Sequence, residues 1–401
     1  MDAVRKILAF NAGRDPERLQ LKYRLMRRSA FAFLRGSCHL FYQQLPHTSL
    51  FNSAPLSWSC GDLHLENFGS YKGDNRLVYF DINDFDEAAL APASWDLLRL
   101  LSSVRVAAAD MGLRAADSGS LCSVFLKAYA ASLAQGKAYW VQRETAQGLV
   151  RDLLDGLDQR RRAEFLDTRS VVIGKKRQLL VDGKKALPAS QAQRERVCAF
   201  MAGFAGTQID PDFYQVLDVA RRIAGTGSLG VERFAILLRG NGHPDGNYLL
   251  DLRQALPSAL APQLKAAQPE WQTQAHRIVA TQYRMQAVTM AFLHPVLMDG
   301  EHYVLRALQP SEDRVSGHQR GQSMADWTPL LQTLGRILAW AQLRSAGREG
   351  SAIADELMDF GHDTAWHEPL LAASQDAAQR VLQDAAAFHA AFDAGALEWA
   401  R

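Results

Sequence analysis

Residues 60–69 of the chain read CGDLHLENFG, and residues 80–87 read FDINDFDE. These two stretches carry the densest polar signal in the sequence, and a run that favours a β-strand, Leu77–Phe80, leads into the second. Phosphoryl transfer needs a carboxylate near the acceptor hydroxyl and oxygen ligands for Mg²⁺. An aspartate followed five residues later by an asparagine supplies both from one loop, and an aspartate after a β-hairpin completes the metal site. The two stretches therefore predict phosphoryl-transfer chemistry.

Asp62, Asn67 and Asp84 have this arrangement. Residues 59–101 resemble the catalytic core of the aminoglycoside and choline phosphotransferase group within the protein-kinase-like superfamily. That group carries a G-D-x-H-x-x-N loop, then an I-D-F-type metal aspartate, then a D-L-x-R-L helix. The resemblance implies that Asp62 is the catalytic base, that Asn67 and Asp84 ligate Mg²⁺, and that His64 braces the loop.

Two further aspartates extend this assignment. The resemblance implies that Asp96 anchors the loop from the helix that follows, and Asp86 is a candidate ligand for a second metal ion. More narrowly, residues 33–36 (FLRG), 61–69 and 80–87 look like a large bacterial family known only as a domain of unknown function. That likeness extends over most of the chain and brings almost no biochemistry with it.

The same residues allow two other interpretations, and the sequence excludes one of them. A calcium loop over Asp81–Glu87 is excluded, because Phe85 occupies its fifth position and no glycine stands at its sixth. A metal-hydrolase site built from His64 and the neighbouring carboxylates stays open. Arg35 is a secondary candidate that either reaches a phosphate or substrate carboxylate or caps helix carbonyls.

A second motif lies much later in the chain, where Gly225–Gly230 reads GTGSLG and matches G-x-G-x-x-G. In a Rossmann domain this motif opens a helix. Here residues 231–238 favour a strand instead, and a strand–glycine loop–strand covers the nucleotide phosphates in kinases. We therefore expect ATP to contact Gly225, Gly227, Ser228 and Gly230. The alternative is that the glycines serve only a tight β-turn.

The next predicted strand, Tyr248–Leu252, leads to Arg253, where a kinase places its phosphate-pairing lysine. The family of unknown function generally has lysine there, so this chain departs from the pattern. Arginine keeps the positive charge and grips phosphate oxygens bidentately, but it is longer and planar. We therefore expect arginine at this position to affect turnover more than nucleotide binding. Glu270 and Glu301 are candidate partners of Arg253, and Arg306–Leu308 is a candidate adenine-contacting hinge.

The order of the two motifs is the reverse of that in kinases. A predicted helix, Leu330–Arg344, resembles the long helix that normally leads into the catalytic loop, and opening a kinase chain between helix and loop gives this order. Such permutation is tolerable when the contacts are kept. We therefore expect an α+β, protein-kinase-like, two-lobed and circularly permuted fold. The competing explanation is that one motif is spurious.

This fold divides the chain into four expected parts. They are an N-terminal helical segment (1–58), a catalytic-loop and helical lobe (59–215), a β-rich nucleotide-binding lobe (216–310) and C-terminal helices that complete the helical lobe (311–401). Predicted helices cover 270–292, 324–347 and 372–400, besides the alanine- and leucine-rich stretch 95–157.

The bulk composition limits the classes of function. The chain has 401 residues, 48% of them hydrophobic, and a net charge of +2, so nothing indicates nucleic-acid binding. Its four cysteines are scattered and no run is long and apolar enough to span a membrane, which favours a soluble cytoplasmic protein. The sequence predicts an ATP- and Mg²⁺-dependent phosphotransferase acting on a hydroxyl of an unidentified acceptor. A pseudokinase-type nucleotide-binding or scaffolding protein and an AMP-transferring enzyme are the alternatives.

Overall fold

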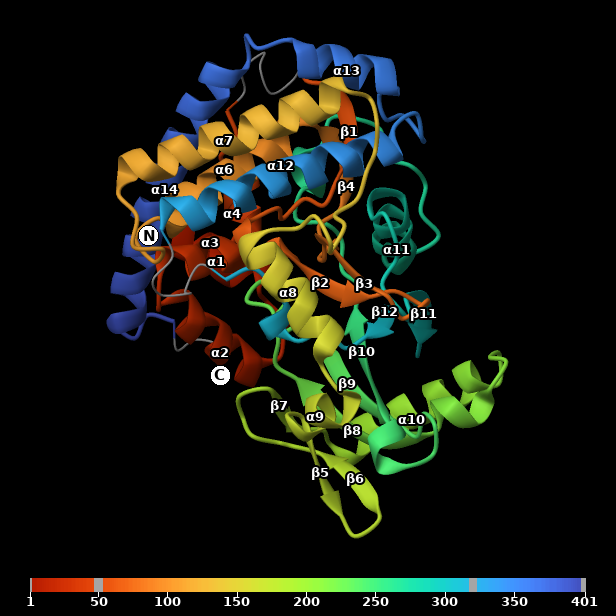
Figure 1. Cartoon of the computed structure of the whole chain (residues 1–401). Helices are drawn as coiled ribbons and strands as arrows, with labels where there is room; N and C mark the ends of the chain where they lie inside the picture. Colours follow the sequence, from red (N-terminus) through yellow and green to blue (C-terminus); the bar gives the residue numbers. More distant parts are fainter. Residues whose placement is uncertain (1, 47–52, 317–322, 398–401) are drawn as a thin grey trace.

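The computed structural model describes residues 2–46, 53–316 and 323–397, and it is a mixed α+β structure. The helices are α1 (Asp2–Phe10), α2 (Pro16–Met26), α3 (Ala30–Gly36), α4 (Cys38–Gln43), α6 (Ser94–Ala107), α7 (Ala115–Ala134), α8 (Gly148–Gln159), α9 (Arg162–Asp167), α10 (Gln191–Ala205), α11 (Gln274–Met285), α12 (Met324–Ser345), α13 (Ala354–His362) and α14 (His367–Asp393). The strands are β1 (Leu56–Ser59), β2 (Phe68–Lys72), β3 (Val78–Ile82), β4 (Ala89–Pro92), β5 (Ser170–Ile173), β6 (Lys176–Leu179), β7 (Ala186–Pro188), β8 (Val216–Arg222), β9 (Arg233–Leu238), β10 (Tyr248–Gln254), β11 (His294–Met298) and β12 (Glu301–Ala307). In Figure 1 most of the long helices gather in the upper part, and the largest sheet lies in the lower part together with α9, α10 and the β5–β6 hairpin.

The main sheet is antiparallel, with the strand order β11-β12-β10-β9-β8-β7. Its five strands between residues 216 and 310 form one sheet, and β7 adds a sixth strand from earlier in the chain. Alternation along β9 puts Phe234 and Ile236 on one face, where they pack against Val197 and Met201 of α10. The sheet and its packing helix thus reach further back in the chain than residue 216.

The helical part buries the largest apolar core. Its central contact is between α7 and α12, where a Cβ on Gly335 would come within 2.4 Å of the carbonyl oxygen of Phe125. This glycine lets the two helix backbones approach closely. A second pair, α6 and α14, packs beside them, and α3 also contacts α14.

Four short strands carry the polar loops. β1 pairs with β4, and β2 pairs with β3, both antiparallel. β1 runs directly into the loop at residues 60–67, and β3 runs into residues 83–88. Because Ser59 at the end of β1 lies opposite Ala89 at the start of β4, both loops emerge at the same place.

The end of α12 lies beside the start of β1. The N–H of Ala352 donates to the carbonyl oxygen of Leu56 (2.8 Å), and Trp58 Nε1 donates to the carbonyl oxygen of Arg348 (3.1 Å). The helix expected at residues 330–344 therefore ends close to the strand that leads into the loop containing Asp62, although the two are far apart in sequence.

Some predicted elements have different bounds. The helix expected over 270–292 begins at Gln274 and ends at Met285, because Gln286 donates to the carbonyl oxygen of Ile82 (2.6 Å) and Ala287 N–H donates to Asp81 (3.1 Å). These tertiary hydrogen bonds draw the chain onto β3. The stretch 95–157 is interrupted between α7 and α8, and α14 begins earlier than expected, at His367. Within the described ranges, no helix combines the length and apolarity that crossing a bilayer requires.

Candidate functional site

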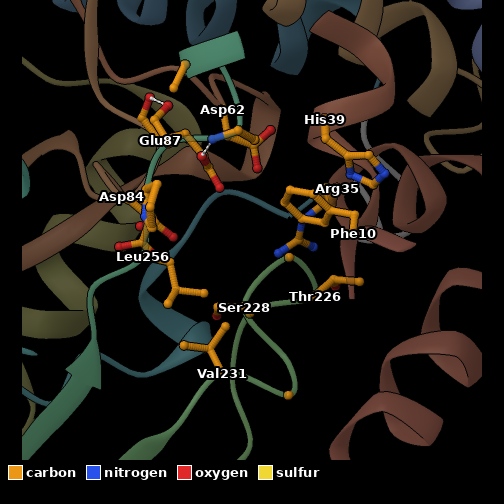
Figure 2. A pocket seen from close by; sticks show the side chains of 18 of the residues that line it. Phe10, Arg35, His39, Asp62, Asp84, Glu87, Thr226, Ser228, Val231 and Leu256 are labelled. Carbon is orange, nitrogen blue, oxygen red and sulfur yellow. Dashed lines mark hydrogen bonds between the residues drawn. The ribbon is translucent and has the colours of Figure 1, made fainter. Parts of the chain in front are cut away.

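A cavity of about 590 Å³ lies where the polar loops, the glycine turn and the N-terminal helices meet (Figure 2). Ten of the residues that the sequence singled out line it: Arg35, Asp62, His64, Asn67, Asp84, Asp86, Gly225, Gly227, Ser228 and Gly230. Figure 2 shows Asp84 and Glu87 on one side, Asp62 at the top, Ser228 and Val231 below, and His39 with Phe10 on the far side. Segments far apart in the sequence therefore share one cavity.

The loop that begins this site is fixed by a buried carboxylate. Asp96, at the start of α6, accepts hydrogen bonds from the N–H groups of Cys60 (3.0 Å) and Gly61 (3.1 Å). This is the anchoring contact expected from the resemblance. Gly61 has φ +82°, and a Cβ there would lie 2.1 Å from the carbonyl oxygen of Glu87, so only glycine fits. Burial raises the pKa of Asp96 to about 6.

Asp62 is held by a fully buried arginine. Arg99 of α6 donates to Asp62 Oδ1 through Nε (3.0 Å) and Nη2 (2.6 Å), and Nη2 also donates to the carbonyl oxygen of Leu34 (2.8 Å). Burial raises the pKa of Asp62 even though Arg99 opposes that shift. His64 Nε2 lies 4.0 Å from Asp62 Oδ2, and burial lowers the pKa of His64 well below its usual value. The histidine is therefore a neutral neighbour of the Asp62 carboxylate.

Asn67 ties the two polar loops together. Its Nδ2 donates to the carbonyl oxygens of Asp62 and Asp84, both at 3.2 Å. The amide nitrogen is thereby used by the backbone, which leaves Oδ1 as the atom available to a cation. Asn67 is buried, so this bridge is protected from water.

Arg253 reaches the site from β10. It does not line the cavity, but its Nη2 donates to Asp84 Oδ1 (3.3 Å) and forms an ion pair with Asp86. The candidate partners Glu270 and Glu301 were wrong, because Arg253 meets these two aspartates instead. Burial favours a higher pKa for both aspartates. At Asp84 the arginines outweigh burial and the pKa is lowered, whereas at Asp86 burial and the Asp84 charge dominate and the pKa is raised.

The sheet face behind the site is strongly basic. Asp251 of β10, fully buried, forms ion pairs with Arg222 (2.9 Å), Arg233 (2.5 Å) and Arg306 (3.5 Å). Arg306, placed in the predicted hinge, also donates to the carbonyl oxygen of Asn83 (3.3 Å). Arg306 therefore holds the loop before Asp84 in place. These contacts do not support the predicted role of Arg306 in contacting adenine.

The glycine turn is fastened to the N-terminal helices. The carbonyl oxygen of Gly227 accepts hydrogen bonds from Arg14 (3.1 Å) and from the buried Lys22 (2.9 Å), and that of Gly230 accepts one from Asp15 N–H (3.0 Å). Gly230 has φ +92°, and a Cβ there would lie 2.9 Å from Arg14 Cβ. The turn thus needs glycine for its backbone and for its close approach to α2.

A smaller cavity, of about 240 Å³, adjoins the first. The two share Arg35, Arg314, Gly225 and Thr226. The smaller one lies between the sheet and the segment after β12, and its wall includes Ala235, Leu249 and residues 308–310. The two cavities are therefore adjacent, and Arg35, Arg314 and the start of the glycine turn border both.

The oxygen donors present suit Mg²⁺. Asn67 Oδ1 and the Asp84 carboxylate are hard ligands, and Mg²⁺ is held by one or two carboxylates together with substrate phosphates. Asp86 is engaged with Arg253, which makes it the weaker candidate. Across residues 2–46, 53–316 and 323–397, no group of three or more His, Cys, Asp or Glu side chains is arranged to hold a metal.

Four charged residues of the site were given no role by the sequence. Arg14, Glu87 and Arg314 line the cavity, and Arg99 binds Asp62. Glu87 ends the second polar stretch, and Arg99 is the arginine of the D-L-x-R-L helix, three residues after Asp96 and on the same face of α6, so the pattern could have indicated both. Arg14 and Arg314 come from segments with no local signal.

No curated protein and no solved structure matches this chain. One protein-family model does, described as "Uncharacterized protein conserved in bacteria" (DUF2252), and it matches residues 14–391. The matched range includes both polar loops, the glycine turn and Arg253, and leaves only Phe10, Ala12 and Gly13 of the cavity wall outside it. The chain therefore belongs to this family of uncharacterized bacterial proteins.

Proposed function

We propose that this protein binds ATP and Mg²⁺ and transfers a phosphoryl group to a hydroxyl, with a circularly permuted kinase-like fold. One observation carries the proposal. The glycine turn and the loops bearing Asp62 and Asp84, distant in the sequence, line the same cavity of about 590 Å³. Neither motif is specific by itself, but together they place a candidate phosphate-binding turn and acidic side chains in one cavity.

The strand order supports the same interpretation. Counting from β8, the glycine turn joins the first and second strands, and Arg253 lies on the third, which is where kinases carry the phosphate-pairing lysine. A helix, α11, follows the third strand as αC does in kinases. It bears Arg277, which donates to the carbonyl oxygens of Asp86 and Leu256, both at 2.9 Å. Kinases pair a lysine on the third strand with a glutamate on αC. This chain has Arg253 on the strand and Arg277 on the helix, so it departs from the kinase pattern on both elements.

The chain's own residues have distinct roles in this proposal. Asp62 orients the acceptor hydroxyl and takes its proton, since its pKa is raised by burial and Arg99 fixes its carboxylate. Asn67 and Asp84 hold Mg²⁺, which supplies charge neutralisation at the phosphates. The backbone of the glycine turn binds phosphate oxygens. Arg253 lies behind the cavity wall, so it joins them by exchanging its contact with Asp84 or Asp86 for phosphate.

The smaller cavity is the place for the nucleoside. Its apolar wall of Ala235, Leu249 and Leu308 suits a flat base, and Arg35 and Arg314 line both this cavity and the larger one. Nε of Arg314 is buried without a hydrogen-bond partner within the described ranges, and burial lowers its pKa to about 10. A phosphate between the two cavities would satisfy this donor.

Thermal unfolding in the presence of nucleotides tests the proposal. ATP with Mg²⁺ at 100 times Kd should stabilise the chain by about 2.7 kcal/mol. Asp84→Asn should remove the Mg²⁺-dependent part of that gain, whereas Asp212→Asn, which changes an exposed partner of Arg239, should leave it intact. A wild-type chain that ATP and Mg²⁺ do not stabilise, or an Asp84→Asn chain that keeps the full Mg²⁺ effect, would contradict the assignment.

Nucleotide binding without turnover is the second candidate function. The observation in its favour is that Arg253, at the lysine position, already pairs with both Asp84 and Asp86. ATP consumption separates the two candidates. Stabilisation by ATP and Mg²⁺ without ATP consumption, across a range of hydroxyl acceptors, would favour the second.

A further inference from the structure

A third cavity, of about 340 Å³, lies on the other side of the segment after β12. Leu249, Leu308, Gln309 and Pro310 line both this cavity and the smaller one proposed for the nucleoside. A ligand in this cavity would contact the same residues as a base bound in the smaller one, but from the opposite side. The proposed phosphotransferase chemistry makes no use of it.

Cations gather on the wall of this cavity. Lys72, Arg76, Arg160, Arg161 and Arg162 line it, and Asp313 is the one acid among its lining residues in the described part of the chain. Asp313 is paired with Arg160, which donates to both of its carboxylate oxygens. The chain as a whole carries a net charge of only +2, so this concentration of positive charge is local.

Three of these cations have no carboxylate of their own. Among the ion pairs of the described residues, Arg160 has Asp313 and Arg161 has Glu164, while Lys72, Arg76 and Arg162 are in none. Burial lowers the pKa of Lys72, and the neighbouring arginines lower it further against the opposing charge of Asp158. An anion placed here would relieve that repulsion.

Aromatic rings hold the guanidinium groups in place. Arg162 lies 3.9 Å above the ring centre of Tyr248, and Arg76 lies 5.3 Å from the same ring and 4.8 Å from that of Phe292. A guanidinium over a ring face is attracted by the ring without using its N–H donors in a hydrogen bond. These contacts therefore position the guanidinium groups without consuming their donors, as a preformed anion site requires.

Phe292 is held in an unusual conformation beside these arginines. Its φ is +61°, which a bulky residue rarely adopts, and its N–H donates to Asp74 Oδ1 (3.0 Å). Strained residues of this kind cluster at ligand sites, where the surroundings over-determine them.

We propose that this basic-aromatic cavity binds a small organic anion, a phosphate or carboxylate joined to an apolar body of about one aromatic ring. Lys72, Arg76 and Arg162 bind the anionic group, and Leu157, Met290 and Pro310 contact the apolar body. A cavity of about 150 Å³ holds benzene, so 340 Å³ accommodates one ring together with its anionic group. A concave cavity of this size favours a small molecule over an extended nucleic-acid strand.

Calorimetric titration of the full chain at low ionic strength tests this site. Phenyl phosphate and benzoate represent the two sources of the anion, while inorganic phosphate and phenol each supply half of the ligand. We expect phenyl phosphate or benzoate to bind at least about tenfold more tightly than either half, since both kinds of contact contribute. Which of the two binds better identifies the anionic group. No binding of either would overturn the proposal.

Charge-removing variants locate the binding. Arg162→Gln and Lys72→Gln should each weaken binding by roughly tenfold to a hundredfold, the range for a hydrogen bond to a charged group. Arg151→Gln on the neighbouring α8 is the matched control, because Arg151 pairs with Asp155 and does not line the cavity. Equal effects of the three substitutions, or displacement of the ligand by ATP, would overturn this site. This comparison does not depend on ATP binding, so the phosphotransferase assignment can fail separately.

Discussion

Two clusters of buried charged residues lie on neighbouring parts of the molecule. One has more arginines than carboxylates, and the other has more carboxylates than arginines paired with them. In the sealed cluster, Asp251 meets Arg222, Arg233 and Arg306, and all four side chains are buried. In the cavity cluster, four carboxylates face the large cavity: Asp62, Asp84, Asp86 and Glu87. Arg99 and Arg253 are the cations paired with three of these acids.

The pKa directions follow these balances. Burial favours a higher pKa for Asp251, but its three arginines reverse that and hold the pKa well below its usual value. In the cavity cluster, burial raises the pKa values of Asp62, Asp86 and Glu87, that of Glu87 to about 7, and only Asp84 has its pKa lowered by neighbouring arginines. The sealed cluster thus satisfies its carboxylate internally, whereas burial prevails at three of the four carboxylates of the cavity cluster. The comparison suggests a structural role for the first and a binding or catalytic role for the second.

The largest expected effect is on turnover and concerns the cavity cluster. Asp62→Asn should lower the rate of ATP consumption about 10²–10⁴-fold while leaving nucleotide affinity nearly unchanged, because the amide cannot take the acceptor proton. Rapid-quench measurement of ATP consumption with a productive acceptor checks this, and circular dichroism controls for folding. A variant with full rate would remove Asp62 from catalysis.

The sealed cluster should respond in stability instead. Asp251→Asn leaves three buried arginines without their carboxylate and should lower the free energy of unfolding by about 3–5 kcal/mol. Urea denaturation measures it. Asp212→Asn, at an exposed ion pair, is the control and should change stability by less than about 0.5 kcal/mol. If Asp251→Asn proves as harmless as the control, the contrast between the two clusters disappears.

A pH titration sharpens the comparison at Glu87. Its pKa rises from 4.5 unfolded to about 7 folded, so the folded state binds more protons in this window. Stability linked to Glu87 is therefore complete below pH 4.5 and is lost as the pH rises to about 7, by roughly 3 kcal/mol. Glu87→Gln keeps an acceptor for Ala259 N–H and should abolish this part of the pH dependence. Parallel stability curves for the two chains would contradict the raised pKa.

The smallest effect is expected at Arg253. Arg253→Lys should keep or improve ATP consumption and change ATP affinity by less than about tenfold, or 1.4 kcal/mol, because the charge is preserved. Arg253→Ala should weaken binding of ATP more than that of adenosine, since only ATP offers phosphates. Equal losses for the two ligands would show that Arg253 does not meet phosphate.

Local patterns determined much of the site's composition. The spacing of Asp62, Asn67 and Asp84 predicted a polar loop and an aspartate after a hairpin, and the glycine turn between two strands was predicted from β-branched and aromatic residues around it. These features are local, because turn geometry and strand alternation depend on neighbouring residues. The α+β class and the helix at residues 330–344 follow from periodicity in the same way.

Only the tertiary structure decided what these pieces face. It gave Arg253 its partners Asp84 and Asp86 in place of Glu270 or Glu301, and it brought Arg14 and Arg314 into the cavity wall. It also ended α11 early, through hydrogen bonds to β3. Such contacts join residues that are distant in sequence, and they depend on how helices and strands pack around a shared core. A sequence pattern reports which face of its own element is apolar, but the charge that a buried arginine meets comes from another element.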